Sequence, residues 1–103
     1  MSHTTDHGTR LARAIAAHAS KSGCPVIVAN AEWRYWSSAT FAGARHGMTL
    51  LAPCSAPLEK WMKALAEAEF DIPRTLVADL SISGIKRESG TITVQIEALT
   101  VDI

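Results

Sequence analysis

One stretch of sixteen residues limits the fold more than any other feature, because its side chains alternate with a period of two. Over residues 26–41 one parity is apolar almost throughout, whereas the other becomes polar after Val28. This pattern is typical of a strand in a sheet with one buried face. Because sixteen residues exceed the usual strand, we expect a bulge or a break near Asn30–Glu32 or near Ser37–Ser38. The apolar parity holds Ile27, Ala29, Ala31, Trp33, Tyr35, Ala39 and Phe41.

Segments typical of hairpin turns follow this stretch and recur near the end of the chain. Glycines bracket G-A-R-H-G at 43–47, and glycine accepts the backbone angles of a tight turn, so we expect a hairpin loop there. M-T-L-L-A at 48–52 is then the returning strand. Residues 74–86 and the segment after R-E-S-G at 87–90 alternate in the same way, which predicts a second hairpin.

Two segments have the residue spacing of amphipathic helices. The first is rich in alanine and ends at about Ser22, and either Asp6 or Thr9 can cap its start. The second is expected over about 57–70, with Ser55 as its cap. Each has one apolar stripe, which indicates that both helices pack against the sheet.

The order of these elements is α-β-β-α-β-β. It predicts an α+β protein with two helices on one face of an antiparallel sheet of four or five strands. With 103 residues, 48% of them hydrophobic, the chain suits a single domain, 1–103, with 1–8 as a disordered tail. V-I-V-A-N-A at 26–31 is echoed by T-L-V-A-D-L at 75–80, 49 residues later, but six positions do not establish a duplication.

The end of the chain breaks the alternation of its last strand. After Ala98 the apolar parity changes, so that Leu99, Val101 and Ile103 are apolar. A bulge near Ala98 would explain the change, and so would a strand that ends with apolar residues on both faces as a partner surface. A sheet with one uncovered face also has open edges, which favours a homodimer, another homo-oligomer or a protein partner.

Composition disfavours several classes of function. Ten basic and ten acidic residues give no net charge, which argues against a nucleic-acid binder. No apolar run suits a signal peptide or a membrane span. Cys24 and Cys54 have no metal-ligand spacing, and a disulfide between them stays open because the sequence does not give their distance. We therefore expect a soluble cytoplasmic protein with reduced thiols, no membrane contact and no cofactor.

The charges are distributed unevenly along the chain. Residues 1–55 carry a net charge of +3, and residues 56–103 carry a net charge of −3. This asymmetry can help identical subunits to pair complementary surfaces, and it can equally be scatter over a solvated surface.

Four of the six aromatic residues lie within nine positions and divide into two groups by parity. Trp33, Tyr35 and Phe41 continue the apolar parity, so we expect them in the core. Trp36 has the opposite parity and lies beside Arg34. Trp36 and Arg34 form a candidate surface for a planar ligand or a partner subunit, because both contacts favour these residue types.

The segment 43–47 provides a second candidate site. Backbone N–H groups next to its glycines, with Arg45 and His46, could hold a phosphate or a carboxylate. The segment lacks the lysine and the spacing of a phosphate-binding P-loop, and a tight hairpin explains its glycines without a ligand. The candidate ligand-binding residues are Arg34, Trp36, Arg45 and His46.

Catalytic and metal-binding patterns are weak. Cys54 precedes a predicted helix, where a thiolate is activated, so Cys54 with His46 is the best candidate pair of nucleophile and base. A small buried thiol is the simpler explanation of Cys54. His3 and His7 have a workable spacing for two metal ligands, but no acidic ligand joins them, and we expect no metal site.

Together these observations favour a small non-enzymatic module that acts through self-association or protein–protein assembly. The alternative is an anionic-ligand binder, or a modest enzyme, with a pocket near 43–47. The solvent accessibility of the three tryptophans would show which face of the sheet is free for either function.

Overall fold

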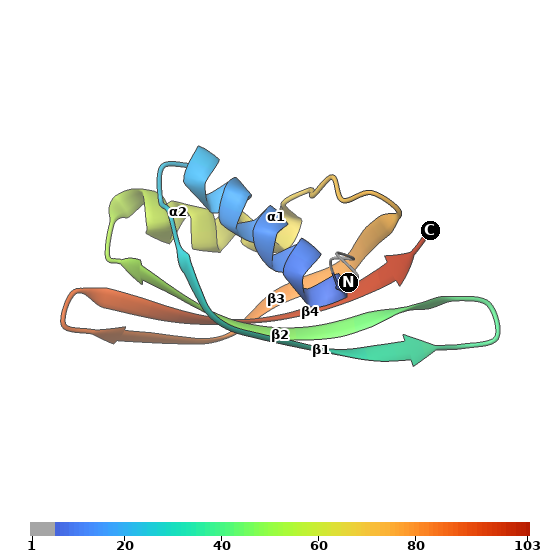
Figure 1. Ribbon diagram of the computed structural model, residues 1–103. Helices are drawn as coiled ribbons and strands as arrows, with labels where there is room; N and C mark the ends of the chain where they lie inside the picture. The colour runs from blue at the N-terminus through green and yellow to red at the C-terminus, as the bar shows by residue number, and fades with distance from the viewer. Residues whose placement is uncertain (1–5) are drawn as a thin grey trace, which may run out of the picture.

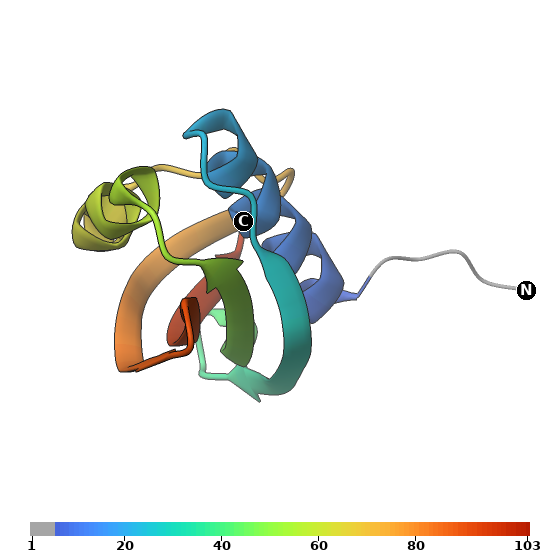
Figure 2. The same cartoon turned by 90° about the vertical axis from the view of Figure 1, so that its left-hand side faces the viewer.

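The computed structural model describes residues 6–103 and has the predicted order of elements (Figure 1). The elements are α1 (His7–Lys21), β1 (Ile27–Ser37), β2 (Ala42–Pro53), α2 (Ala56–Ala64), the 3-10 helix η1 (Leu65–Glu67), β3 (Thr75–Glu88) and β4 (Thr91–Asp102). Four antiparallel strands form one sheet in the order β1-β2-β4-β3. Both helices lie on one face of this sheet (Figures 1 and 2), which confirms the predicted α+β class.

Side chains cap both helices. The Asp6 carboxylate accepts a hydrogen bond of 2.7 Å from the Thr9 backbone N–H, so Asp6 is the cap of α1. The same hydrogen bond lowers the pKa of Asp6. The Ser55 hydroxyl accepts from the Leu58 N–H at the start of α2, as predicted. Local sequence therefore fixes where each helix begins.

The start of α1 corrects part of the predicted tail, 1–8. His7 and Gly8 form the first turn of α1, because the Asp6 cap begins the helix ahead of them. Residues 1–5 lie outside the described residues.

The second helical segment ends before residue 70, its predicted end, because Ala68 adopts an extended conformation. The chain can then bring Phe70 to α1, where its ring centroid lies 5.1 Å from that of His18. His18 Nδ1 also accepts a hydrogen bond of 2.8 Å from the Trp61 indole of α2. One histidine of α1 thus contacts both α2 and the segment that follows it.

The core lies between the helices and the covered face of the sheet. Alternate residues of β2 and β4, such as Leu50 and Val94, point toward the helices and are fully buried. Leu11 and Ile15 of α1 are buried above them. The core comprises Leu11, Ala12, Ile15, Ala19, Cys24, Met48, Leu50, Ala52, Leu58, Trp61, Met62, Leu65, Ile72, Leu80, Ile92, Val94, Ile96 and Ala98.

The turn between β1 and β2 lies at 38–41, so the predicted hairpin loop at 43–47 is wrong. The Ser38 N–H donates to the Phe41 carbonyl over 2.7 Å, and the Ser38 hydroxyl accepts from the Phe41 N–H. A serine side chain therefore closes this turn without glycine. The segment 43–47 belongs to β2, where Gly43 permits a close approach of the neighbouring strand.

A bulge in β1 decides which of its side chains face the helices. It lies between Val28 and Asn30, at the border of the first predicted position. Val28 is on the covered side before the bulge, and Trp33 and Tyr35 are on the covered side after it. The prediction that the apolar parity of this strand faces the helices is therefore correct only for the residues after the bulge.

The three aromatic residues that we expected in the core are exposed. Trp33, Tyr35 and Phe41 retain 38%, 58% and 57% of their accessible surface. The β1–β2 hairpin projects beyond both helices (Figure 1), so the covered side of the sheet has no helix above it there. Trp33 still reaches α1, where its ring centroid lies 4.7 Å from that of His7.

The strand β4 keeps its alternation to the end, so the predicted bulge near Ala98 is wrong. The irregularities lie in the neighbouring strand β3, within 77–79 and 82–84. Leu99 and Val101 consequently point away from the helices, as the alternative explanation of this segment required.

The structure repeats one α-β-β unit. β2 begins at residue 42 and β4 at residue 91, 49 residues apart, and each has 12 residues. The helix caps have the same separation. Because β2 pairs with β4, the two units meet at the centre of the sheet. The midpoints of both strands lie between the residue pairs Gly47–Glu97 and Met48–Ile96. The short echo in the sequence falls on the equivalent strands β1 and β3.

Substitution of Gly43 tests the close approach of β2 and β4. A Cβ at Gly43 would overlap the backbone carbonyl oxygen of Thr100, so Gly43→Ala must displace one of the central strands. We expect this substitution to lower the free energy of unfolding by roughly 2–4 kcal/mol, measured by urea denaturation. The control is Gly47→Ala, whose Cβ would lie 3.7 Å from its nearest neighbour on Glu32, with an expected change below about 1 kcal/mol. Equal losses would contradict the close approach.

Candidate functional site

The sheet face away from the helices, called the open face below, lies uncovered within residues 6–103 (Figure 1). The antiparallel register aligns its side chains in rows that cross all four strands. Counted from the β1–β2 turn, rows one to four are Trp36–Gly43–Val101–Leu76, Arg34–Arg45–Leu99–Asp79, Glu32–Gly47–Glu97–Ser81 and Asn30–Thr49–Gln95–Gly84.

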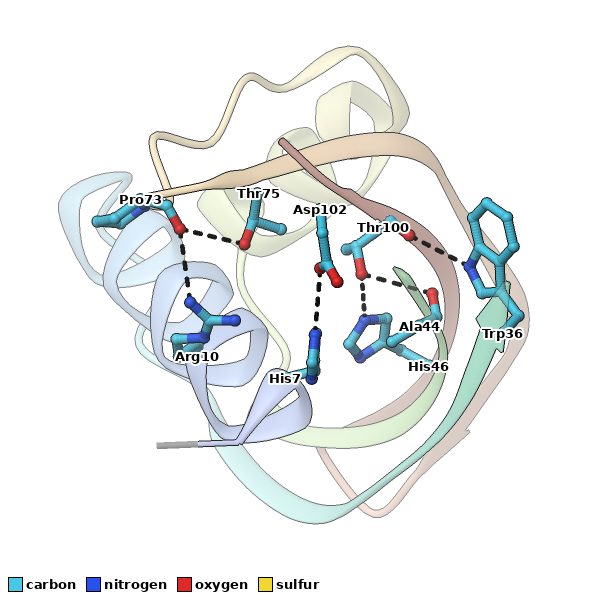
Figure 3. Close-up of polar contacts among 9 residues, drawn as sticks. All are labelled: His7, Arg10, Trp36, Ala44, His46, Pro73, Thr75, Thr100 and Asp102. Atoms are coloured by element: carbon cyan, nitrogen blue, oxygen red, sulfur yellow. Dashed lines mark hydrogen bonds and ion pairs between the residues drawn. The ribbon is translucent and has the colours of Figure 1, made fainter. Parts of the chain in front are cut away.

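Row one is apolar. Gly43 offers no side chain, and the Trp36 indole reaches past it to donate a hydrogen bond of 3.3 Å to the Thr100 carbonyl (Figure 3). This bond ties β1 to β4 across β2 and leaves Trp36 half-buried. Val101 and Leu76 complete the row, and Leu76 is 52% exposed. Row one is therefore an apolar strip across the sheet.

Row two places two arginines side by side. Arg34 and Arg45 are directly opposite each other on β1 and β2, an arrangement that is unfavourable for like charges. Within the described part of the chain, neither guanidinium takes part in an ion pair. Asp79 ends the same row, and Glu32 and Glu97 lie in row three. The open face thus carries both signs of charge on different strands.

An open hollow of about 610 Å³ extends over rows two to four. Gly47 lies in its middle, between Glu32 and Glu97, and leaves the sheet backbone uncovered there. Arg34 and Arg45 line one end of the hollow. The structure therefore brings together three of the four residues proposed for ligand binding, Arg34, Trp36 and Arg45, on one face.

The side chain of the fourth residue, His46, points to the covered face, and His46 is only 5% exposed, so its imidazole cannot share a site with the arginines even though the residue borders the hollow. Its Nε2 lies 2.9 Å from the Thr100 hydroxyl oxygen, which itself donates to the Ala44 carbonyl over 3.4 Å (Figure 3). This chain of bonds requires the Nε2–H tautomer. Nδ1 has no hydrogen-bond partner among residues 6–103, and burial lowers the pKa of His46 to about 4.

Polar side chains surround His46 under the first turn of α1 (Figure 3). His7 Nε2 lies 3.2 Å from the Asp102 carboxylate, and Arg10 donates to the Pro73 carbonyl over 3.5 Å. The gap between α1 and Thr100 has no room for a water molecule. His46 is therefore closed off on this side, while His7 and Asp102 stay partly exposed, and we interpret the cluster as part of the packing of α1 on the sheet.

The predicted pair of Cys54 and His46 is wrong. Cys54 is exposed just beyond β2, where its N–H donates to the Gly90 carbonyl over 2.8 Å. Eight residues of extended chain, about 26 Å, separate it from His46. Cys24 is buried and its Sγ lies 3.4 Å from the Ala19 carbonyl oxygen, and burial raises the pKa of its thiol. Both cysteines are free, and the small buried thiol is Cys24 and not Cys54.

Residues 6–103 contain no group of three side chains that could hold a metal ion. Of the two histidines weighed as ligands, His7 bonds to Asp102 and His3 lies outside the described residues.

Parity in the sequence placed Asp79 and Glu97 on the uncovered face correctly, but it placed Leu76 on the covered face, and the structure corrects this. Leu76, Asp79 and Glu97 join Trp36 and Arg34 only through the register of three strand pairs. The polar parity of each strand was visible in the sequence, but the alignment of one strand with the next was not.

No protein-family model, curated protein or solved structure matches this chain. Neither helix in 6–103 is long and apolar enough to cross a membrane. The functional conclusions below therefore depend on the geometry of the open face.

The buried histidine predicts a pH dependence of stability. The folded pKa of His46, about 4, lies below its usual 6.5, so the unfolded chain binds the proton more readily. We expect neutral His46 to make its full contribution to the free energy of unfolding above about pH 6.5. This contribution should fall by on the order of 3 kcal/mol as the pH is lowered to about 4.

The measurement is the free energy of unfolding of the native protein and of His46→Gln across this pH range. The native protein is expected to lose stability more steeply on acidification, so the difference between the two should shrink or change sign. A difference that is independent of pH would show that the protonation of His46 is not linked to folding.

Proposed function

We propose that this protein is a small non-enzymatic module that self-associates through its open face. The observation that carries the proposal is the apolar row one next to the unpaired arginines of row two. Trp36, Leu76, Leu99 and Val101 bring apolar surface to a face that no described element covers. Tryptophan and arginine are enriched in protein interfaces for this combination of apolar area and directional charge.

The charges of the open face are self-complementary. The arginines lie on β1 and β2, in the first α-β-β unit, together with the single carboxylate Glu32, whereas Asp79 and Glu97 lie on β3 and β4, in the second. This division follows the charge asymmetry of the sequence, +3 for residues 1–55 and −3 for 56–103. A second copy of the chain can therefore supply acidic groups to Arg34 and Arg45, which a symmetric interface requires.

The edges of the sheet are less suited to association than its face. All three irregularities of the sheet lie in the edge strands, at 28–30 in β1 and at 77–79 and 82–84 in β3. Bulges twist an edge and interrupt its row of hydrogen-bonding groups, which opposes the addition of another strand. These features support association through the face.

The size of the open face indicates a weak or moderate affinity. Four rows about 7 Å apart over strands about 4.8 Å apart give about 500 Å² for each copy. The total of about 1,000 Å² is at the lower limit of specific interfaces, so we expect a dissociation constant in the micromolar range.

Size-exclusion chromatography with light scattering tests the proposal. Over about 5–200 µM we expect the average mass to rise toward that of a dimer, because the affinity is micromolar. Leu76→Asp places a charge in row one and should shift this transition at least tenfold higher in concentration, with little effect on folding since Leu76 is 52% exposed.

Ile85→Asp is the matched control. Ile85 also lies on β3 and is 43% exposed, but it points to the covered side of the sheet. We expect it to leave the transition unchanged. A native protein that stays monomeric throughout, or equal effects of the two substitutions, would overturn association through the open face.

The hollow supports a second candidate function, the binding of an anionic small molecule by Arg34 and Arg45. Two guanidiniums at one end of a hollow of about 610 Å³ suit a phosphate or a polycarboxylate. The two functions differ in thermal unfolding: self-association makes Tm depend on protein concentration, whereas an anion raises Tm at constant protein concentration. Arg45→Ala should abolish any stabilisation by inorganic phosphate or citrate.

A further inference from the structure

We propose, as an extension that rests on the self-association proposed above, that two copies stack open face to open face about a two-fold axis parallel to the strands. In this arrangement β1 of each copy lies over β3 of the other, and β2 lies over β4. Arg34 then faces Asp79 of the second copy, and the interface contains this ion pair twice.

The order of the strands determines what such an axis does to the rows. It reverses β1-β2-β4-β3 into β3-β4-β2-β1 and leaves positions along the strands unchanged. Each row therefore meets the same row of the second copy in reverse order. Because twisted sheets stack at about 30° to one another, the alignment is best for the middle rows, two and three.

Rows two and three carry the charges, and the reversal pairs opposite signs in row two. Arg34 is opposite Asp79 of the second copy, since these residues end row two on β1 and β3. Glu97 of the second copy lies over Gly47, where the hollow leaves space for it between Glu32 and Glu97 of the first copy. Its carboxylate is then one row, about 7 Å along the strand, from Arg45. Arg34 thus obtains a carboxylate directly opposite it, in addition to Glu32 one row away on its own strand.

Row one gains apolar contacts in the same arrangement. Trp36 is opposite Leu76 of the second copy, and Val101 of the second copy lies over Gly43 and the indole that covers it. Two apolar strips, one from each copy, then exclude water together. The contact of Trp36 with Leu76 places an aromatic anchor against the exposed end of the partner row.

The other two-fold axis in the plane of the interface gives a poorer match. An axis perpendicular to the strands keeps the strand order and reverses the rows. If it pairs row two with row three, so that Arg34 meets Glu32, then the apolar row one meets row four, which holds Asn30, Thr49 and Gln95. Polar side chains would lose water there without hydrogen-bond partners on Trp36 and Leu76.

Charge reversal distinguishes these arrangements. Arg34→Asp and Asp79→Arg each place like charges at both copies of the pair, so each variant alone should dimerise at least tenfold more weakly. An equimolar mixture of the two variants restores opposite charges at both positions. We expect the mixture to form a heterodimer with an affinity within about threefold of the native protein, as should the double variant alone.

Light scattering measures the recovered dimer mass of the mixture. Energy transfer between fluorophores, one on each variant, shows that the dimers contain both variants. Arg34 and Asp79 are both exposed, so circular dichroism should show native folding of each variant. Lys86→Asp is the control, because Lys86 also lies on β3 and on the open face but outside rows one to four, and it should change little. Loss of association without recovery in the mixture overturns the proposed axis.

The two proposals fail in different ways. If Arg34→Asp regains association when mixed with Glu32→Arg and not when mixed with Asp79→Arg, self-association through the open face stands and the axis is perpendicular to the strands. If the native protein is monomeric at every concentration tested, the self-association itself is wrong.

Discussion

The pairing of β2 with β4 is the interaction on which the rest of the structure depends. It joins two α-β-β units through eleven consecutive residue pairs, from Gly43–Val101 to Pro53–Thr91, without an irregularity. On the covered side it brings Leu50 and Val94 together under the helices. On the open side it sets the register of every row. Because period-two alternation assigns each residue to a face, a slip by one position would exchange the core with the open face.

The two faces of this sheet differ in the side chains that they carry and in whether these are buried. The covered face buries an aliphatic core, and its polar exceptions, His46 and Thr100, bond to each other. The open face leaves two arginines opposite each other without acidic partners in the described part of the chain, next to an apolar strip. The irregularities that discourage pairing at an edge are confined to β1 and β3. The features that favour contact are thereby concentrated in the middle of the open face.

Local patterns in the sequence predict the class, the element order and the helix caps, because each depends on a few neighbouring residues. Two predictions were wrong because they depend on more than local sequence: the burial of Tyr35 and the position of the β1–β2 turn. Tyr35 has the parity of a covered residue, but parity does not tell how far α1 extends over the hairpin. The glycines at 43 and 47 resemble a loop, whereas the Ser38 side chain closes the real turn. The rows were not predictable, since they combine the registers of three strand pairs.

The repeated unit also has a consequence for the order in which the chain folds. Within each unit the contacts are local: a helix, a short connection and a hairpin closed by a tight turn, which form quickly because little chain entropy is lost. The pairing of β2 with β4 joins residues about fifty apart and brings two preformed halves together. Assembly of these halves therefore resembles the association of two small subunits that share one chain, and we expect its transition state to contain both hairpins and part of the pairing between the central strands.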